Sequence, residues 1–362
     1  MGRINVLVVD DSVVVRRLVT TVLEQDPDIT VVGTAASGRI AISKLAQVAP
    51  DCVTLDMEMP DLDGLGTLRE LRRTHPRLPV IMFSTLTERG ARATLDALAL
   101  GANDYVCKPA NVGSVPEAMA SVREQLVPKI KALSRPAAGV APAAVRRTPS
   151  TLPPATGTVP TGRIDVLAVG SSTGGPDALS AVLPQLPASF PVPVVVVQHM
   201  PPVFTRMFAQ RLDSKCALSV KEAEHGDLVV PGRVLIAPGD QHLELKRVGT
   251  SVVAQLTSAP PEHFCRPAVD VLFRSVASVY GGSVLAVVLT GMGSDGARGA
   301  EVLRRAGAEV VAQDQASSVV WGMPGAVVGA GLAHRVLPLD RVAADMVGVA
   351  GRARASALAA RR

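Results

Sequence analysis

Cysteines are few in this sequence and long apolar runs are missing, and both absences narrow the class of protein. The four cysteines lie far apart and form neither a Cys-x-x-Cys pair nor a cluster with histidines. Such spacing argues against a structural zinc site and is typical of a reducing compartment. No apolar run is long enough to span a bilayer, and the opening segment MGRINVLVVDDS has a short apolar stretch that ends in two acids, unlike a signal peptide. We therefore expect a cytoplasmic protein with no membrane insertion.

The charge balance also argues against one class of partner. Lys and Arg number 37 against 32 Asp and Glu, which gives a net charge of +5. Much of this excess comes from arginines that lie outside the two periodic regions described next, namely Arg135, Arg146, Arg147, Arg352, Arg354, Arg361 and Arg362. Because a nucleic-acid-binding domain gathers its basic residues on one folded face, we expect no nucleic-acid partner.

Two regions of alternating β-branched runs and amphipathic helical patterns are separated by a Pro- and Ala-rich stretch. Residues 1–134 contain five such units, which predict a small doubly wound domain with a five-stranded parallel sheet. Residues 135–162 lack hydrophobic periodicity and are expected to form a flexible linker. Residues 163–350 predict a second doubly wound, Rossmann-like α/β domain, in which hairpin-like pieces favour a mixed sheet. A basic tail, 351–362, follows.

Charged and hydroxyl side chains follow several predicted strands of the first domain. Asp10 and Asp11 follow the first strand, Asp56 the third, Ser84 the fourth and Lys108 the fifth. The carboxyl ends of parallel strands meet at one edge of a sheet, so these groups are expected to lie together. An aspartate after a strand often only caps the next helix, but that does not explain five matching positions. Clustered carboxylates favour a hard divalent cation such as Mg²⁺, and a nearby ammonium and hydroxyl suit a phosphoryl group.

This arrangement resembles the flavodoxin-like receiver domain of response regulators over residues 4–130. The resemblance implies that Asp56 accepts a phosphoryl group. It further implies that Mg²⁺ is held by Asp10, Asp11 and Asp56 together with the main-chain carbonyl of Glu58.

The same resemblance assigns the residues that respond to phosphorylation. Lys108 would contact the phosphoryl group, Ser84 would be the switch hydroxyl, and Tyr105 matches the aromatic residue that changes rotamer. A phosphoryl group adds roughly −1.5 to −2 charges. We expect this charge to draw Ser84 and Lys108 inward and to reshape the face of the fourth helix.

Three features of the second domain follow apolar strands and together contain a nucleophile, a base and an acid. They are the turn GSSTGG with Ser171 and Ser172, the segment QHMPP with His199, and the segment LTGMGSDG with Asp295. If the strands are parallel neighbours, one serine, His199 and Asp295 meet at a single edge as a catalytic triad. Each feature alone is weak, because glycine turns and single histidines are common without catalysis. Within the turn itself, the choice between the two serines stays open.

Other interpretations of these segments have less support. The turn lacks the Gly-Lys-Ser/Thr of a P-loop and the G-x-G-x-x-G of dinucleotide-binding proteins, which makes a dehydrogenase a poor alternative. The remaining histidines show no ligand spacing, and we interpret them as surface or loop residues: His75, His225, His242, His263 and His334.

The motifs GSSTGG, QHMPP, RPAVDVLF and LTGMGSDGA occur in this order and resemble those of the CheB-type chemotaxis methylesterases. This family places its nucleophile directly before Thr-Gly-Gly, which implies Ser172, with His199 as the base and Asp295 as the acid. The resemblance also implies that the Met292 N–H stabilises the oxyanion. Thr173 either hydrogen-bonds His199 or caps the next helix.

The resemblance implies a phosphorylation-regulated hydrolase that demethylates glutamate γ-methyl esters and deamidates glutamines on chemoreceptor helices. Its partners would be methyl-accepting chemoreceptors, as substrates, and a histidine kinase of the CheA type, as phosphodonor. Mg²⁺ would be needed for phosphorylation, and ester hydrolysis would need no cofactor. A non-catalytic interaction module on the same fold stays open as an alternative, whereas the alternation of strands and helices over residues 164–340 argues against a DNA-binding output.

Overall fold

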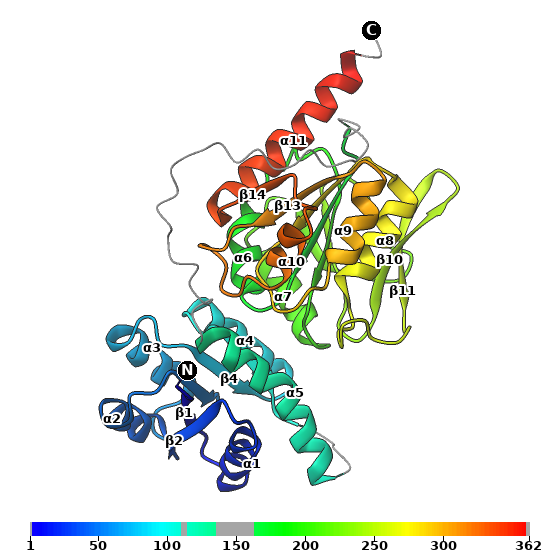
Figure 1. Ribbon diagram of the computed structural model, residues 1–362. Helices are drawn as coiled ribbons and strands as arrows, with labels where there is room; N and C mark the ends of the chain where they lie inside the picture. Colours follow the sequence, from blue (N-terminus) through cyan, green and yellow to red (C-terminus); the bar gives the residue numbers. More distant parts are fainter. Residues whose placement is uncertain (1, 110–113, 135–162, 360–362) are drawn as a thin grey trace. The chain divides into compact units, whose positions relative to one another are not determined.

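The computed structural model describes residues 2–109, 114–134 and 163–359, with only the backbone described for residues 352–359. The chain divides into two compact units, Met1–Arg146 and Arg147–Arg362 (Figure 1). The linker expected over residues 135–162 lies outside the described residues. Among the residues that are described, no helix combines the length and the apolar character needed to cross a bilayer.

The first unit contains the five-stranded parallel sheet that the sequence predicts, in the flavodoxin-like order β2-β1-β3-β4-β5. Its strands are β1 (Ile4–Val9), β2 (Ile29–Ala35), β3 (Cys52–Asp56), β4 (Val80–Ser84) and β5 (Asp104–Cys107). Its helices are α1 (Val13–Glu24), α2 (Gly38–Val48), α3 (Gly64–Thr74), α4 (Glu88–Ala99) and α5 (Val115–Ser134).

Side-chain hydrogen bonds stabilise the N-termini of α1 and α3, near the edge of the sheet at which β1 and β3 end. Asp10 Oδ1 accepts a hydrogen bond from the Ser12 N–H at 2.9 Å, and Ser12 is the N-cap of α1. Asp63 caps α3 by accepting from the Gly66 N–H at 2.7 Å. Apolar side chains of α1 and α5 pack together with those of β1 in one buried cluster. The carboxyl ends of β1 and β3 are therefore held in a well-packed framework.

The second unit contains a seven-stranded sheet in the order β14-β13-β12-β6-β7-β9-β8. All neighbouring pairs are parallel. Its strands are β6 (Val166–Ser171), β7 (Val194–Gln198), β8 (Ser219–Glu222), β9 (Arg233–Ile236), β12 (Val284–Val288), β13 (Glu309–Gln313) and β14 (Arg335–Leu337).

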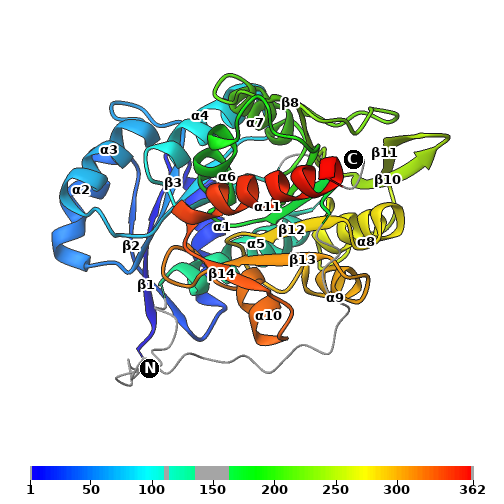
Figure 2. The same ribbon diagram turned by 90° about the horizontal axis from the view of Figure 1, so that it is seen from above.

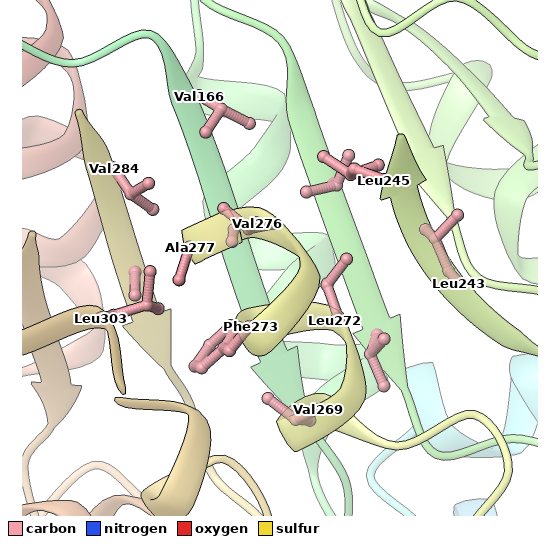
Figure 3. Packing of buried hydrophobic residues seen from close by; sticks show 14 of the residues in the cluster. Val166, Leu243, Leu245, Val269, Leu272, Phe273, Val276, Ala277, Val284 and Leu303 are labelled. Carbon is pink, nitrogen blue, oxygen red and sulfur yellow. The ribbon is translucent and has the colours of Figure 1, made fainter. Parts of the chain in front are cut away.

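The expectation of a mixed sheet is wrong. The hairpin-like pieces, β10 (His242–Val248) and β11 (Ser251–Thr257), form a separate two-stranded antiparallel sheet. Leu243 and Leu245 of β10 are buried in the same apolar cluster as helix α8 (Figure 3). The hairpin thus covers the helix with its apolar side chains and pairs with itself, so it adds no antiparallel strand to the main sheet.

Helices cover both faces of the seven-stranded sheet. α6 and α11 contact each other on one face, and α8, α9 and α10 lie on the opposite face (Figures 1 and 2). α11 continues through the position at which the sequence suggested a boundary between domain and tail. The helices are α6 (Gly175–Val182), α7 (Phe204–Asp213), α8 (Val269–Tyr280), α9 (Ala297–Arg305), α10 (Met323–Gly329) and α11 (Leu339–Ala359), and a short 3₁₀ turn (Leu183–Gln185) follows α6.

Helix α8 carries the centre of the apolar core. Val269, Leu272, Phe273 and Val276 are fully buried and follow the spacing of one helix face (Figure 3). Where α8 begins, it approaches β6 so closely that a Cβ at Gly170 would lie 2.4 Å from Val269 Cγ1. Only glycine allows this approach. The packing fixes the start of α8 beside the carboxyl end of β6.

The order of the central strands determines where a site can form. β6 lies between β12 and β7, and the chain reaches β7 directly after β6 but returns to β12 only later. In open parallel sheets such a reversal leaves a crevice at the carboxyl ends of the strands, where ligands bind. The loops that follow β6, β7 and β12 therefore meet at this crevice.

Replacing Phe273 by Ala is expected to lower the free energy of unfolding of the second unit by about 3–5 kcal/mol, because it leaves a cavity under α8. Phe264 is fully exposed and provides a matched control. Phe264→Ala is expected to change the same quantity by less than about 0.5 kcal/mol. Guanidinium denaturation followed by the fluorescence of Trp321, the single tryptophan of the chain, reports on this unit. Equal losses in the two variants would contradict this account of the core.

Candidate functional site

The acidic residues predicted to cluster in the first unit do so. Asp10 and Asp56 are buried, Asp11 is exposed, and each offers a carboxylate oxygen within 4.8 Å of the others. The Lys108 ammonium lies 3.0 Å from Asp10 Oδ2 and 2.8 Å from Asp56 Oδ1. The structure therefore brings together four of the residues that the sequence placed at this edge.

The electrostatics of this cluster suit a further cation. Burial raises the pKa of Asp56 to about 6, the charge of Asp10 adds to the rise, and Lys108 opposes it. Among the described residues, Asp56 Oδ2 is buried without a hydrogen-bond partner. A buried carboxylate oxygen of this kind is a natural ligand for Mg²⁺, and one lysine does not balance three carboxylates. The donor set thus fits the divalent ion that the sequence predicts.

The other receiver positions have defined surroundings. Ser84 is buried, and its hydroxyl donates to the Gly90 carbonyl at 3.2 Å while accepting from Thr94 Oγ1 at 2.7 Å. Tyr105 is buried with the Lys129 ammonium 5.3 Å from its ring centre. Ser84 is therefore tied to the first turns of α4, and Tyr105 contacts α5.

The Glu58 main chain lies close to the acidic cluster. The Glu58 N–H donates to Asp56 Oδ1 at 3.4 Å. The Glu58 side chain turns to the surface, where it lies 3.7 Å from the Arg89 guanidinium. Glu58 therefore contacts the cluster through its backbone N–H.

In the second unit, the sheet brings the segments of the predicted triad to one edge. Ser172 directly follows β6, His199 directly follows β7, and Asp295 lies in the loop after β12. The Ser172 N–H donates to the Thr290 carbonyl at 3.0 Å, and the His199 N–H donates to the Ser171 carbonyl at 3.1 Å. These bonds extend the strand ladders by one residue and hold the three loops together.

His199 and Asp295 form a buried pair. His199 Nε2 lies 2.8 Å from Asp295 Oδ2. The same oxygen accepts from the Val269 N–H at 2.7 Å, while Oδ1 accepts from the N–H groups of Asp270 and Gly296, both at 2.8 Å. Two of these donors begin α8, whose N-terminal end favours a negative charge. Both oxygens of the Asp295 carboxylate are therefore satisfied.

This geometry shifts the pKa of each partner. Burial would lower the pKa of His199, but the hydrogen bonds to Asp295 and Cys265, together with the charge of Asp295, outweigh it, so the pKa lies above the usual range. Burial would raise the pKa of Asp295, but His199 and the backbone N–H groups keep it below the usual value. Asp295 therefore stabilises the imidazolium that forms when a neutral His199 accepts a proton.

The two serines have different environments. Ser171 is fully buried, and its hydroxyl donates to Gln198 Oε1 at 2.7 Å. Gln198 in turn donates through Nε2 to the Ser172 carbonyl at 2.9 Å. Ser172 is only half-buried, and within the described residues its hydroxyl makes no hydrogen bond. Ser171 therefore supports the turn, whereas the Ser172 hydroxyl is available to a substrate.

The sequence analysis missed a cysteine beside the histidine. Cys265 Sγ lies 3.5 Å from His199 Nδ1, the ring nitrogen that Asp295 does not occupy. Cys265 stands 66 residues after His199, and no spacing rule connects the two positions. Only the tertiary fold could have revealed this contact.

Met292 and Thr173 lie on the turns next to Ser172. Within the described residues, the Met292 N–H has no hydrogen-bond partner, although the neighbouring Gly291 N–H donates to Val320 O at 3.0 Å. The Thr173 carbonyl accepts from Thr290 Oγ1 at 2.9 Å. The N-cap of α6 is Gly174 at φ +75°, so Thr173 does not cap that helix.

The interpretation of His242 as a surface or loop residue is wrong, whereas His263 does lie in a half-buried turn before α8. His242 is fully buried and bonded through both ring nitrogens, to the Pro260 carbonyl at 3.1 Å and to the Ala268 N–H at 3.2 Å. His263 Nε2 lies 2.8 Å from Oδ2 of the buried Asp270. Both histidines brace the segment that leads into α8, a role that isolated positions in a sequence do not indicate.

Comparison with known proteins places both units. Residues 167–346 match the family described as CheB methylesterase, and residues 6–120 match the response regulator receiver domain. A protein-glutamate methylesterase/protein-glutamine glutaminase of Nocardioides sp. is 58% identical over 343 residues, covering 94% of this chain and 93% of the relative. A protein of the same name from Trichodesmium erythraeum is 51% identical over 348 residues, covering 96% and 99%.

A solved structure is also similar. The CheB methylesterase catalytic domain of Thermotoga maritima is 45% identical, with a TM-score of 0.51. It covers 51% of this chain and 98% of its own length.

Asp295→Asn is expected to lower the pKa of His199, because the substitution removes the charge that stabilises the imidazolium while the burial remains. The raised pKa of His199 means that this pair stabilises the fold fully below about pH 6.5. That contribution is lost as pH rises through the folded-state pKa. An NMR titration of the imidazole protons measures the shift.

His334 serves as the internal control for this titration. Burial and the nearby Arg304 lower the pKa of His334 to about 4, and Asp295 is not among the causes. Its titration is expected to be the same in both proteins. An unchanged His199 titration in Asp295→Asn would show that Asp295 does not set the protonation of the base.

Proposed function

Because this chain belongs to the CheB methylesterase family and carries a receiver domain, we propose that it demethylates glutamate γ-methyl esters and deamidates glutamines on cytoplasmic helices of chemoreceptors. The observation that carries this proposal is the buried His199–Asp295 pair, whose residues follow β7 and β12, the two strands on either side of the strand that Ser172 follows. Such a substrate places the enzyme in the cytoplasm, where it needs no membrane insertion.

The first chemical step uses Ser172 as the nucleophile. Since His199 Nε2 is engaged by Asp295 at 2.8 Å, the basic nitrogen is Nδ1. His199 Nδ1 takes the proton of the Ser172 hydroxyl while the oxygen attacks the ester or amide carbonyl. The hydroxyl and Nδ1 come into hydrogen-bond contact when substrate binds, as is common for catalytic pairs that lie apart in a free enzyme.

The negative oxygen formed in this step needs donors that are already in place. The Met292 N–H, which has no partner among the described residues, is our candidate donor. Removing one such donor typically costs about 3–4 kcal/mol in the barrier. Thr173, which directly follows Ser172 on the same turn, is our candidate for a residue that lines the cleft. His199 then protonates the departing methanol or ammonia, and water releases the glutamate product.

The receiver unit controls this activity through Asp56. A histidine kinase of the CheA type is the proposed phosphodonor, and Lys108 contacts the transferred group. Asp10, Asp11, Asp56 and the Glu58 carbonyl would hold Mg²⁺, which offsets the charge of the carboxylates and of the incoming phosphoryl group. The ester hydrolysis itself is proposed to need no cofactor.

In this structure the switch hydroxyl, Ser84, is hydrogen-bonded to residues of α4 and not to the acidic cluster. Ser84 would leave Thr94 and Gly90, to which its hydroxyl is bonded, and turn toward the phosphoryl group. Tyr105 would change rotamer at the same time. The face of α4 changes as a result, and we propose that this change exposes the catalytic cleft.

Ser172→Ala is expected to reduce methanol release from a methylated chemoreceptor by about a thousandfold or more, because no hydroxyl remains to form the acyl-enzyme. Ser171→Ala provides the matched control. It leaves Gln198 Oε1 without its donor and is expected to lower the free energy of unfolding by about 1–3 kcal/mol while keeping most of the turnover. Retained turnover in Ser172→Ala, with loss in Ser171→Ala, would reverse the assignment.

Beryllofluoride with Mg²⁺, which mimics the phosphoryl group at an aspartate, is expected to raise ester hydrolysis by the full chain. We expect this rise because the charge added at Asp56 draws Ser84 and Lys108 inward and changes the face of α4, which exposes the cleft. Asp56→Asn is expected to show no rise, and chelation of Mg²⁺ by EDTA is expected to abolish the rise in the wild type. Stimulation that persists in Asp56→Asn would rule out control through this residue.

A further inference from the structure

Cys265, which has no role in the proposed mechanism, contacts His199, the proposed catalytic base. Cys265 Sγ is 3.5 Å from His199 Nδ1, and Asp295 occupies the other ring nitrogen at 2.8 Å. Within the described residues, the Ser172 hydroxyl makes no hydrogen bond. The thiol therefore stands at the ring nitrogen that must accept the proton of Ser172.

The backbone around Cys265 fixes this contact. The Cys265 N–H donates to the Glu262 carbonyl at 2.8 Å, and the Glu262 N–H donates back to the Cys265 carbonyl at 3.1 Å, which closes a tight turn. Glu262 is bonded to Arg274 of α8 at 3.1 Å, and Arg266 is bonded to Asp240 at 3.0 Å. Side chains on both flanks of Cys265 are thus anchored, so the thiol is held against the ring.

The other three cysteines of the chain lie in different surroundings. Burial raises the pKa of the Cys52 thiol to about 12 and the pKa values of Cys107 and Cys216 to about 11. Within the described residues, none of the three is hydrogen-bonded to a histidine. Because the thiolate is the reactive form, a raised pKa lowers the reactivity of these three thiols. Cys265 differs, since it is half-buried and has an imidazole as its proton acceptor.

We propose that Cys265 is an oxidation site at which hydrogen peroxide reversibly switches off the esterase, an inference that rests on the proposed role of His199. The thiol proton passes to His199 Nδ1, and the thiolate sulfur attacks one peroxide oxygen. The O–O bond breaks, and hydroxide leaves and takes the proton from the imidazolium to form water. The sulfur is oxidised to a sulfenic acid while the peroxide oxygens are reduced.

The product would block the base directly. The new S–OH group lies where the Ser172 hydroxyl must approach Nδ1, so His199 can no longer take its proton. A sulfenic acid is reduced by an added thiol, which makes the inhibition reversible. The sensitivity of the esterase to peroxide thus arises at Cys265 in the second unit and needs no change in the receiver unit.

The test compares the full-length protein with Cys265→Ser and with a matched control, Cys216→Ser. Each protein is treated with hydrogen peroxide, and methanol release from a methylated chemoreceptor is expressed relative to the same protein before treatment. The wild type and Cys216→Ser are expected to lose about tenfold or more of their activity and to recover it with dithiothreitol. Cys265→Ser is expected to lose less than about twofold at the same dose. Equal loss in Cys265→Ser overturns the proposal.

A second measurement does not depend on turnover. Iodoacetamide labels thiolates, and the rate of labelling at each cysteine is followed by mass spectrometry of the full-length protein. His199→Gln is expected to slow labelling of Cys265 about tenfold, because the proton acceptor is lost, and to leave labelling of Cys216 unchanged. Unaltered labelling of Cys265, or a sulfenic acid at Cys265 in a fully active wild type, overturns the proposal.

The two measurements also separate this proposal from the proposed function. If the untreated wild type releases no methanol, the esterase function is wrong, whatever the state of the thiol. If the untreated wild type is active but Cys265 forms no sulfenic acid under peroxide, the function stands and the oxidation site is wrong.

Discussion

The candidate site of the second unit depends on the hydrogen bonds that the buried Asp295 carboxylate accepts at the start of α8. An unpaired charge in that position would be strongly destabilising. Here three backbone N–H groups and the His199 ring satisfy both oxygens, at distances of 2.7 to 2.8 Å. Since two of those donors begin α8, the helix cannot move without disturbing the carboxylate. The orientation of the His199 ring, and hence the nitrogen that contacts Cys265, follows from this one group.

Both units use the same property of parallel sheets for different chemistry. Strand ends converge, so residues that lie far apart in the chain meet at one edge. In the first unit this gathers three carboxylates against Lys108, an arrangement that suits a divalent cation and a phosphoryl group. In the second unit it gathers a hydroxyl, an imidazole and a carboxylate, an arrangement that suits acyl transfer. The difference lies in the few side chains that follow the strands.

Much of this could be predicted because strands and their ends are local features. Short β-branched runs mark β1 and β6, and the residue after each run is known once the strand is known. The pattern of β10 and β11 predicts a hairpin but does not indicate which surface the hairpin covers, and that surface is α8. The burial of His242 is not predictable for the same reason, since its ring is bonded to Pro260 and Ala268. Periodicity reports that a face is apolar but not what packs against it.

The sequence by itself determined the two α/β units, the residues at their strand ends and, through its resemblance to the CheB-type methylesterases, Ser172 as the serine to consider. The tertiary structure decided the rest. It bonded Ser171 to Gln198, it set Asp295 on one nitrogen of His199, and it brought Cys265 to the other. These contacts join residues up to 96 positions apart. Their geometry depends on how α8 packs over β6, and no local pattern of residues specifies that packing.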